Sequence, residues 1–365
     1  MEIHPPLIEL LGGRWRFEAP AAAAAWSDDG SLVAFALGDG TVALARAEWE
    51  GGPEPRTRAS GGVEVHPPTV SSPPVSRVHT HEGPCRALVA QPGGGFLSGG
   101  EDGRIVRLGP DGSIDADTRP VGQGIDLLAA RMGAWAYASG CEVVVTGPSR
   151  HILTFPAAIS ALAFDPTGHR LGVGYQDGVS ICPDDGATAR RLSFDGLPLA
   201  LTWSPDGAWL AVGLAAGGVR AWRSDGSVDV VPGGHSGEVR SLGFSAGGHL
   251  LAASGAPRVL YWQLHQREVS RPGECGLPSS RAPVTAVAWH PVRPLIAAGY
   301  ASGAILLCQP GAEDVLFIRG AGGGAALWLA WSPDGSRLAF ATEAGEAGLA
   351  LLPEGLFRSS EGPRK

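Results

Sequence analysis

The chain of 365 residues carries 28 basic and 36 acidic side chains, a formal net charge of −8, and 44% of its residues are hydrophobic. It is long enough to bury a substantial core, and its length alone would suggest two domains. Glycine and proline make up almost a quarter of the residues, against about 12% in an average protein. Because 11 Trp and many aliphatic residues run through the same stretches, this excess indicates turn-rich, all-β structure rather than disorder.

Charge and cysteine usage exclude several classes of function. Lys365 is the only lysine and no basic run occurs, so we expect no binding to nucleic acid or to an anionic membrane. The five cysteines are widely spaced without a CxxC motif, which argues against a disulfide framework or a zinc knuckle. The uncharged stretch 294–312 contains Gly and Pro and predicts a hairpin rather than a membrane span. No signal peptide is visible at the N-terminus, so we expect a cytoplasmic protein.

One structural unit repeats along the chain. An apolar strand ends at an anchor residue, usually aromatic, and is followed by a turn rich in Asp, Pro and Gly and then by two more apolar strands. Such turns need Pro to set φ, Asp to bond nearby amides and Gly for positive φ. Apart from the first, the intervals between anchors cluster near the ~40–45-residue period of four-stranded propeller blades. The anchors are Trp26, Ala90, Ala130, Phe164, Trp203, Phe244, Trp289 and Trp331.

Eight anchors predict a closed, all-β propeller of eight four-stranded blades, each completed by an outer strand from the next repeat. The N-terminal strand 14–17 has the character of such an outer strand, and we expect it to complete the last blade and leave no open edge. Seven blades are the alternative if the degenerate unit 121–147 is an insert. The predicted domain covers 14–356 between flexible ends, with 357–365 as a C-terminal tail.

Residues 48–77 account for the long first interval. They are rich in Pro, Gly and Ser, a composition typical of a mobile surface loop. We therefore predict an insert loop between the third and outer strands of the first blade.

These features resemble the WD40 family of β-propellers over nearly the whole chain. The resemblance rests on the Trp-Ser-Pro-Asp-Gly turns, on the pair Gly234-His235 before an apolar strand, and on third strands that end in Trp222 and Trp262. The Trp-Asp pair that gives the family its name is absent, because Arg and Gln follow these two tryptophans. The resemblance implies the propeller fold, which the repeat period supports independently.

The family can hold a blade together with a His–Ser/Thr–Asp–Trp network, and the resemblance implies parts of it here. Blade two offers His81, Ser98 and Asp102 but no Trp, whereas blade six offers His235 and Trp262 but no Asp. In two other blades the Trp position holds Cys182 or Cys308, where we expect small, buried and unreactive thiols.

Enzymatic propellers place carboxylates, His or Asn around the central channel. The eight strands expected to line it contain one carboxylate, Asp126, and no histidine. A metal needs three or four ligands and acid–base hydrolysis usually needs two carboxylates. We therefore expect a protein that is not an enzyme and that carries no cofactor.

Two alternatives remain beside this interpretation. His79 and His81 are two residues apart and would share one face of a strand. The first alternative is therefore a propeller that binds a metal or a small ligand through these two histidines. The simpler interpretation makes His81 part of the blade network and leaves His79 exposed. The chain also resembles periplasmic propellers of the TolB type in its Ser-Pro-Asp-Gly turns, but it lacks their export signal.

The function that the sequence favours is a monomeric scaffold for protein–protein interaction. Loops of one face surround the channel, and their mixed charges favour a polypeptide partner of unknown identity. Tyr and Arg are the residue types that carry binding energy at such surfaces, although cross-strand packing is an equal alternative for the two tyrosines. The candidate partner-binding residues are Glu82, Glu101, Arg104, Tyr175, Gln176, Glu238, Arg240, Arg258 and Tyr300.

Overall fold

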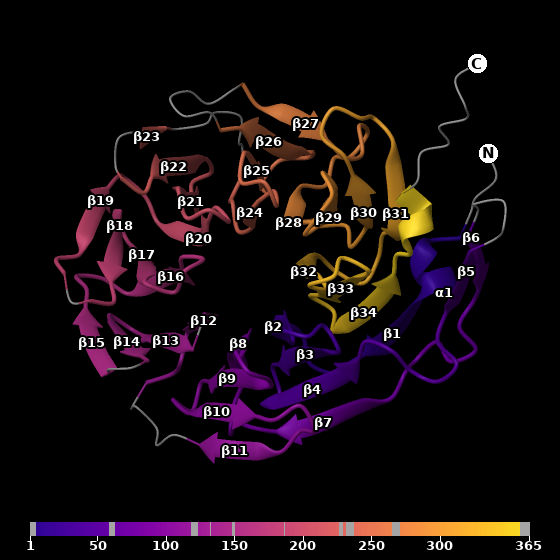
Figure 1. Ribbon diagram of the computed structural model, residues 1–365, viewed down its shortest axis with the longest axis horizontal. Coiled ribbons are helices and arrows are strands. Elements are labelled where there is room, and N and C mark those ends of the chain that lie inside the picture. Colours follow the sequence, from indigo (N-terminus) through magenta and orange to yellow (C-terminus); the bar gives the residue numbers. More distant parts are fainter. Residues whose placement is uncertain are drawn as a thin grey trace.

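Eight four-stranded antiparallel sheets stand around a central axis and form a closed β-propeller (Figure 1). The computed structural model describes residues 5–57, 63–117, 123–131, 133–147, 150–185, 187–225, 229–230, 237–264 and 271–357. The predicted fold class and the count of eight blades are confirmed, and the degenerate unit 121–147 is a blade rather than an insert.

Every blade begins with its innermost strand, and the sheet order follows the chain outward. Blades 1 to 4 consist, from inside to outside, of β2 (Ala21–Trp26), β3 (Leu32–Leu37), β4 (Thr41–Arg46) and β7 (Val75–His79); β8 (Cys85–Ala90), β9 (Phe96–Gly100), β10 (Ile105–Leu108) and β11 (Ile114–Asp117); β12 (Leu127–Arg131), β13 (Ala134–Ser139), β14 (Glu142–Thr146) and β15 (Arg150–Thr154); and β16 (Ile159–Phe164), β17 (Arg170–Tyr175), β18 (Gly178–Pro183) and β19 (Arg190–Ser193). Blades 5 to 8 consist of β20 (Pro198–Trp203), β21 (Trp209–Leu214), β22 (Val219–Arg223) and β23 (Asp229–Val230); β24 (Leu242–Phe244), β25 (Leu250–Ala253), β26 (Val259–Gln263) and β27 (Gly273–Cys275); β28 (Val284–Trp289), β29 (Ile296–Tyr300), β30 (Ile305–Cys308) and β31 (Val315–Arg319); and β32 (Ala326–Trp331), β33 (Arg337–Thr342), β34 (Glu346–Leu351) and β1 (Gly12–Arg16).

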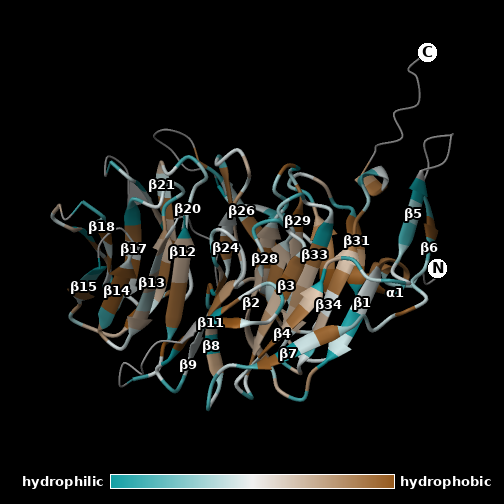
Figure 2. Cartoon of the chain, turned by 60° about the horizontal axis from the view of Figure 1, so that its bottom comes forward, coloured by the Kyte–Doolittle hydropathy of each residue, from teal (hydrophilic) through white to brown (hydrophobic). Residues whose placement is uncertain are grey.

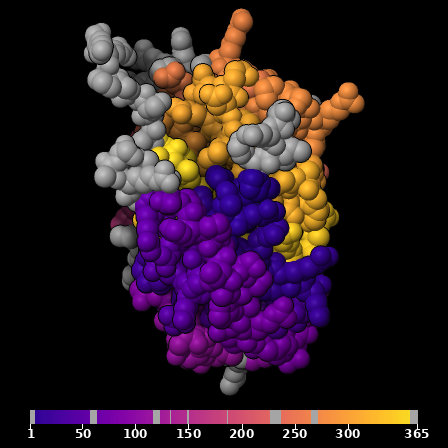
Figure 3. All heavy atoms as spheres, turned by 90° about the vertical axis from the view of Figure 1, so that its right-hand side faces the viewer, coloured from indigo at the N-terminus to yellow at the C-terminus, as the bar shows by residue number. Residues whose placement is uncertain are grey.

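The two ends of the chain close the ring together, as the sequence predicts. Strand β1 is the outer strand of blade 8 and pairs antiparallel with β34, with Trp15 opposite Ala347. The strand begins at Gly12, two residues before the predicted start. Figure 3 shows N-terminal and C-terminal residues side by side on this flank of the molecule. Pairing with β1 covers the edge that β34 would otherwise expose.

A short helix, α1 (Leu7–Leu11), precedes β1 where the sequence analysis expects a flexible end. Its Ile8 and Leu11 are 2% and 1% exposed, and Ile8 packs in the cluster between blades 7 and 8. The helix buries two large aliphatic side chains, so the ordered domain begins before the predicted boundary at residue 14. At the other end, a 3-10 turn spans Glu354–Phe357, and the predicted tail after residue 357 lies outside the described residues.

The core consists of layers between neighbouring blades. Strands in the middle of a blade are buried on both faces, as β3 shows with six buried residues in a row, because each sheet has a blade on either side. Figure 2 shows the same arrangement, with hydrophobic residues along the strands and hydrophilic residues in many of the turns.

Four anchor tryptophans bond one blade to the preceding one. Each indole N–H donates to a backbone carbonyl on the innermost strand of the preceding blade, at distances of 2.8 to 3.2 Å between nitrogen and oxygen. The indole therefore fills space between two sheets, and its only hydrogen-bond donor bonds to the neighbouring blade across the same gap. The pairs are Trp26 with Ala330, Trp203 with Ala163, Trp289 with Gly243 and Trp331 with Ala288.

The insert of the first blade is more structured than the predicted loop. It contains a two-stranded hairpin of β5 (Glu54–Thr57) and β6 (Val63–His66), and the outer strand β7 already begins at Val75. The Trp49 indole N–H donates to the Val70 carbonyl at 3.0 Å and holds the base of the insert together.

The same insert lies along the strand that closes the ring. The Arg14 N–H donates to the Ser71 carbonyl at 2.9 Å, and the Ser72 hydroxyl donates to the Arg14 carbonyl at 3.0 Å. The Trp15 indole N–H donates to the Pro73 carbonyl at 2.8 Å. Because β1 is the outermost strand of its sheet, these bonds satisfy backbone groups that would otherwise face solvent.

Within the described residues, no helix has the length and apolar character needed to cross a membrane.

Deleting residues 1–19 should leave β34 with an open edge and expose the cluster that α1 covers. We expect a lower melting temperature and self-association, because an unpaired apolar edge strand recruits other strands. Light scattering and thermal unfolding measure both effects, and Arg16→Ala, an exposed change on the same strand, should stay within ~0.5 kcal/mol of the parent. A truncated protein that stays monomeric with an unchanged melting temperature would contradict this role of β1.

Two deletions in the insert should differ in their effect. Replacing 54–66, the hairpin alone, with a short Gly-Ser link should change the melting temperature little, because loop length costs only ~0.6 kcal/mol per doubling. Extending the deletion from 51 through 72 also removes the Ser71 and Ser72 bonds to β1 and should lower it clearly. Equal melting temperatures for both deletions would show that the insert does not stabilise β1.

Candidate functional site

The ring has two faces with different kinds of loop. The loops that lead from one blade into the next, and the turns between second and third strands, lie together on one face, which we call the histidine face after His81. Backbone bonds join these two sets of loops, such as Glu101 N–H to the Pro84 carbonyl at 3.0 Å and Ala301 N–H to the Pro283 carbonyl at 2.9 Å. The turns after the anchor residues lie on the opposite face, which we call the turn face.

Three charged side chains meet on the histidine face at the start of innermost strands. The Arg86 guanidinium on β8 contacts Glu101 at 2.9 Å and Asp126, just before β12, at 2.7 Å. The three side chains are 40 to 50% exposed. Glu101 is a predicted site residue, whereas Arg86, which joins it to Asp126, is not among the predicted residues.

Two other predicted residues form an exposed pair on blade 6. Glu238 and Arg240 flank the start of the innermost segment, with 2.6 Å between Arg240 Nη2 and Glu238 Oε2. The Gln176 amide in blade 4 is exposed and donates to the neighbouring Asp177 carboxylate at 2.6 Å. These groups are available to solvent and have mixed charge, as the sequence analysis expects for this face.

The two tyrosines of the predicted site are core residues. Tyr175 is 2% exposed and Tyr300 is 1% exposed. The Tyr175 hydroxyl lies 3.0 Å from the Ser180 hydroxyl, and Tyr300 accepts the Leu277 N–H at 3.2 Å. The sequence leaves two interpretations open for these tyrosines, and the structure shows packing between blades. Neither ring can contact a partner without rearrangement of the core.

Arg258 joins two blades and is not part of the charged group around Arg86. Its guanidinium is 3.5 Å from Glu274 on the outer strand of blade 6 and 3.8 Å from Glu313 of blade 7. Its side chain is only 20% exposed. We therefore assign it to the contact between blades 6 and 7.

His81 forms the polar network that the WD40 resemblance implies for blade 2. Its Nε2 is 2.8 Å from the Ser98 hydroxyl and its Nδ1 is 3.1 Å from Asp102. A carboxylate only accepts, so Nδ1 carries the proton and neutral Nε2 accepts from Ser98. Glu82 and Arg104 take part through their backbone N–H groups, which donate to Asp102 at 3.1 and 3.0 Å. The pair Gly234-His235 of blade 6 lies outside the described residues.

This network also bears on the metal-binding alternative. Both ring nitrogens of His81 already have partners, and the side chain is 1% exposed, whereas His79 is exposed on β7. Among the described residues no three His, Cys, Asp or Glu side chains converge as a metal site would require. Burial lowers the pKa of His81, although the Asp102 carboxylate opposes this effect, and a neutral ring is the form that the network requires.

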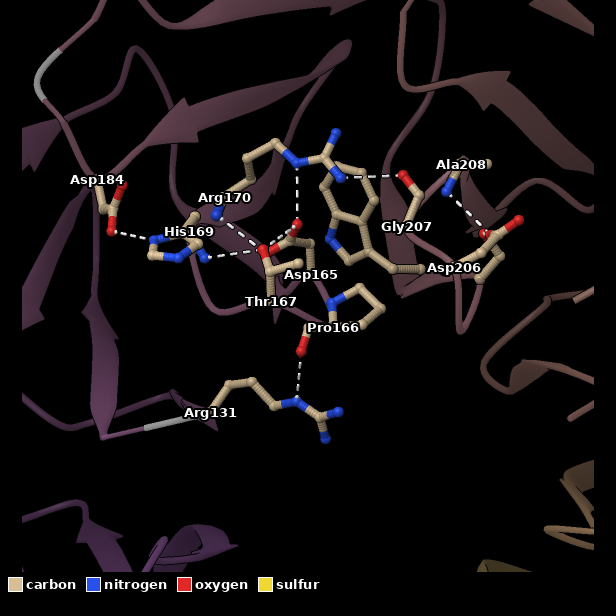
Figure 4. A network of polar contacts seen from close by, with 12 residues as sticks. Arg131, Asp165, Pro166, Thr167, His169, Arg170, Asp184, Asp206, Gly207 and Ala208 are labelled. Carbon is tan, nitrogen blue, oxygen red and sulfur yellow. Dashed lines mark hydrogen bonds and ion pairs between the residues drawn. The ribbon is translucent and has the colours of Figure 1, made fainter.

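The turn face carries a second polar network that the sequence analysis missed (Figure 4). Asp165 replaces the serine of the usual turn, is fully buried, and pairs with Arg170 at 2.9 Å. The Arg170 guanidinium lies 4.8 Å from the ring centre of Trp203 in the next blade. His169 Nδ1 contacts the Asp184 carboxylate at 2.8 Å, and Arg131 donates to the Pro166 carbonyl at 3.1 Å.

Asp165, His169 and Asp184 lie in turns, whereas Arg131 is the last residue of β12 and Arg170 is the first residue of β17. The available signal was the Asp at position 165 in a turn that begins with Ser in four other repeats, because a buried carboxylate needs a cation nearby. His169, unlike His81, is exposed, and its hydrogen bond to Asp184 raises its pKa.

Comparison with known proteins shows the fold but no family. No protein-family model and no curated protein match the chain. Crystal structures of Sqt1 from Chaetomium thermophilum align with TM-scores of 0.69 and 0.68 at 16% and 17% identity, covering 94% of this chain and 99% or 97% of theirs. A crystal structure of the computationally designed Ika8 protein aligns with a TM-score of 0.72 at 16% identity, covering 94% of this chain and 99% of its own. The likeness is one of fold.

The protonation state of His81 should make stability depend on pH. In the unfolded chain His81 takes up a proton as the pH falls below about 6.5. In the folded protein its pKa is lowered, so it takes up this proton only at lower pH. The free energy of unfolding therefore falls as the pH falls below about 6.5. His81→Gln cannot titrate and should show a smaller fall between pH 7.5 and 5.5 in urea unfolding.

His169→Gln is the control for this measurement. The pKa of His169 is raised rather than lowered, so its contribution to stability is present at low pH and is lost as pH rises. Its replacement should leave the fall toward pH 5.5 unchanged or enlarge it. A His81→Gln protein with the same pH profile as the parent would show that His81 is not neutral in the folded state.

Proposed function

We propose that this chain is a divergent member of the WD40 family that acts in the cytoplasm as a scaffold for protein–protein interaction. It works as a monomer, without catalysis and without a cofactor, and its histidine face binds a polypeptide. The partner is neither a nucleic acid nor a membrane, because the chain has an acidic excess and no basic run.

The observation that carries this proposal is the group of exposed charges around Arg86. One arginine joins carboxylates of blades 2 and 3 where the innermost strands begin, and Glu238 with Arg240 adds a second such pair. Exposed pairs contribute little to folding stability. Charges of both signs at a rim instead favour complementary partners and set the rate of association.

The residues that could act as acid or base already have ion-pair or hydrogen-bond partners, and this supports a role without catalysis. Asp126, the one carboxylate among the residues predicted to line the channel, is paired with Arg86, and His81 is held between Ser98 and Asp102. A general base needs access to the proton that it removes. His81 has no such access, since it is buried.

The same blade network favours a WD40 propeller over one of the TolB type. Ser-Pro-Asp-Gly turns are common to both, so they do not distinguish the two. The contacts from His81 to Ser98 and Asp102 are the polar arrangement that the WD40 resemblance implies, and they supply three of its four members in one blade.

Affinity recovery from the native host with matched variants tests the proposal. The face variant combines Arg86→Ala, Glu101→Ala and Arg240→Ala, and the control combines Arg46→Ala, Glu50→Ala and Arg131→Ala near the turn face. Both remove two arginines and one glutamate from exposed positions, so folding should be spared.

We expect the control to recover the same proteins as the parent and the face variant to recover at least about tenfold less of them, which corresponds to ~1.4 kcal/mol. If the control loses them and the face variant keeps them, the binding surface is on the turn face. If no protein is enriched with the parent chain over beads alone, the scaffold function is wrong.

A further inference from the structure

A cavity of about 440 Å³ lies between blades 3 and 4, toward the turn face. Its apolar walls come from Val145 and Leu153 of blade 3 and from Phe164, Leu171 and Cys182 of blade 4. This volume falls within the ~300–1,000 Å³ typical of small-molecule sites, which are mostly apolar with a few polar groups.

The cavity exists because blade 4 has smaller residues at two positions where the next blade has tryptophan. In blade 5, Trp203, Leu210 and Trp222 stand side by side across three strands and fill the layer against blade 4. In blade 4 the same register positions hold Phe164, Leu171 and Cys182, which face blade 3. A thiol in place of an indole leaves the space between these two blades unfilled.

The polar residues of the cavity are at its lip. Arg150 begins β15 and has no ion-pair partner in the part of the chain that the structure describes. His169 and Asp184 face the cavity as a hydrogen-bonded pair with 2.8 Å between Nδ1 and Oδ2 (Figure 4). Asp184 thus already has a hydrogen-bond partner in the imidazole, whereas the exposed Arg150 guanidinium is available to an anion.

Ile152 extends the apolar wall out to the surface. It lines the cavity, and it is 57% exposed although it is a large aliphatic side chain on the outer strand of blade 3. An exposed apolar side chain beside an apolar cavity enlarges the area that a hydrocarbon ligand can cover.

We propose that this cavity binds a small amphipathic carboxylate, with the hydrocarbon body against Phe164, Leu171 and Cys182 and the carboxylate at Arg150. A neutral hydrocarbon would not pair with the Arg150 guanidinium. A polar anion such as phosphate would leave the apolar walls in contact with water. The site lies on the turn face, so it is independent of the scaffold function, and either can fail without the other.

Calorimetric titration with octanoate tests the site. We expect saturable binding with a stoichiometry of one, and weaker binding of hexanoate by roughly fourfold for each methylene lost. Cys182→Trp places an indole where blade 5 has Trp222 and should abolish binding of both. Cys308→Ser, a change at the equivalent position of blade 7, should leave binding unchanged.

Arg150→Gln separates recognition of the head group from occupancy of the cavity. It should weaken octanoate binding at least tenfold while leaving the binding of 1-octanol unchanged. The proposal can therefore still be tested if Cys182→Trp does not fold. The proposal is overturned if octanoate does not bind the parent at millimolar concentration, if Cys182→Trp folds and still binds it equally well, or if Arg150→Gln affects octanoate and octanol alike.

Discussion

Apolar packing between neighbouring blades, joined at four places by an indole hydrogen bond, is the interaction on which the ring depends. Strands of neighbouring blades belong to separate sheets, so the backbone ladders that stabilise each blade do not fix the position of one blade against the next. Anchor tryptophans supply that link at four of the eight contacts between blades, because each fills the layer between two innermost strands and donates to a carbonyl across it. Two of these bonds, from Trp331 to blade 7 and from Trp26 to blade 8, lie at the point where the chain closes on itself.

Closure places different demands on the two faces. The turn after each anchor must reverse the chain tightly, and its Ser and Asp side chains bond within the turn, as Ser204 and Asp206 do around the Ala208 and Trp209 amides. On the histidine face, Arg86 extends from the start of an innermost strand rather than from such a turn. It contacts carboxylates of two blades.

The third strand of each blade has one position whose residue decides how well the layer between blades is filled. Trp222 and Trp262 fill it completely in blades 5 and 6. In blade 7 it holds Cys308, and Cys275 from blade 6 occupies the neighbouring space with 3.2 Å between the sulfur atoms. The hydrogen bond with Cys275 and burial raise the pKa of the Cys308 thiol, and both sulfurs belong to buried residues. In blade 4 the position holds Cys182 without such a neighbour, and a cavity results.

The sequence by itself determined the class of fold and the way the ring closes, and it favoured eight blades over seven. These follow from local rules, since turns need Asp, Pro and Gly at fixed offsets and a sandwiched strand needs apolar residues on both faces. The blade network of His81 could also be predicted, because the resemblance to the WD40 family implies it for His81, Ser98 and Asp102. Which charged residues meet was decided by the tertiary structure: Arg86 and Asp126 are 40 residues apart and become neighbours only through the angle between two blades. The same holds for the burial of Tyr175 and Tyr300, the docking of α1, the course of the insert along β1 and the cavity at Cys182. Each depends on the fit between surfaces from different repeats, and a repeat period describes every blade alike without describing how two of them fill the space between them.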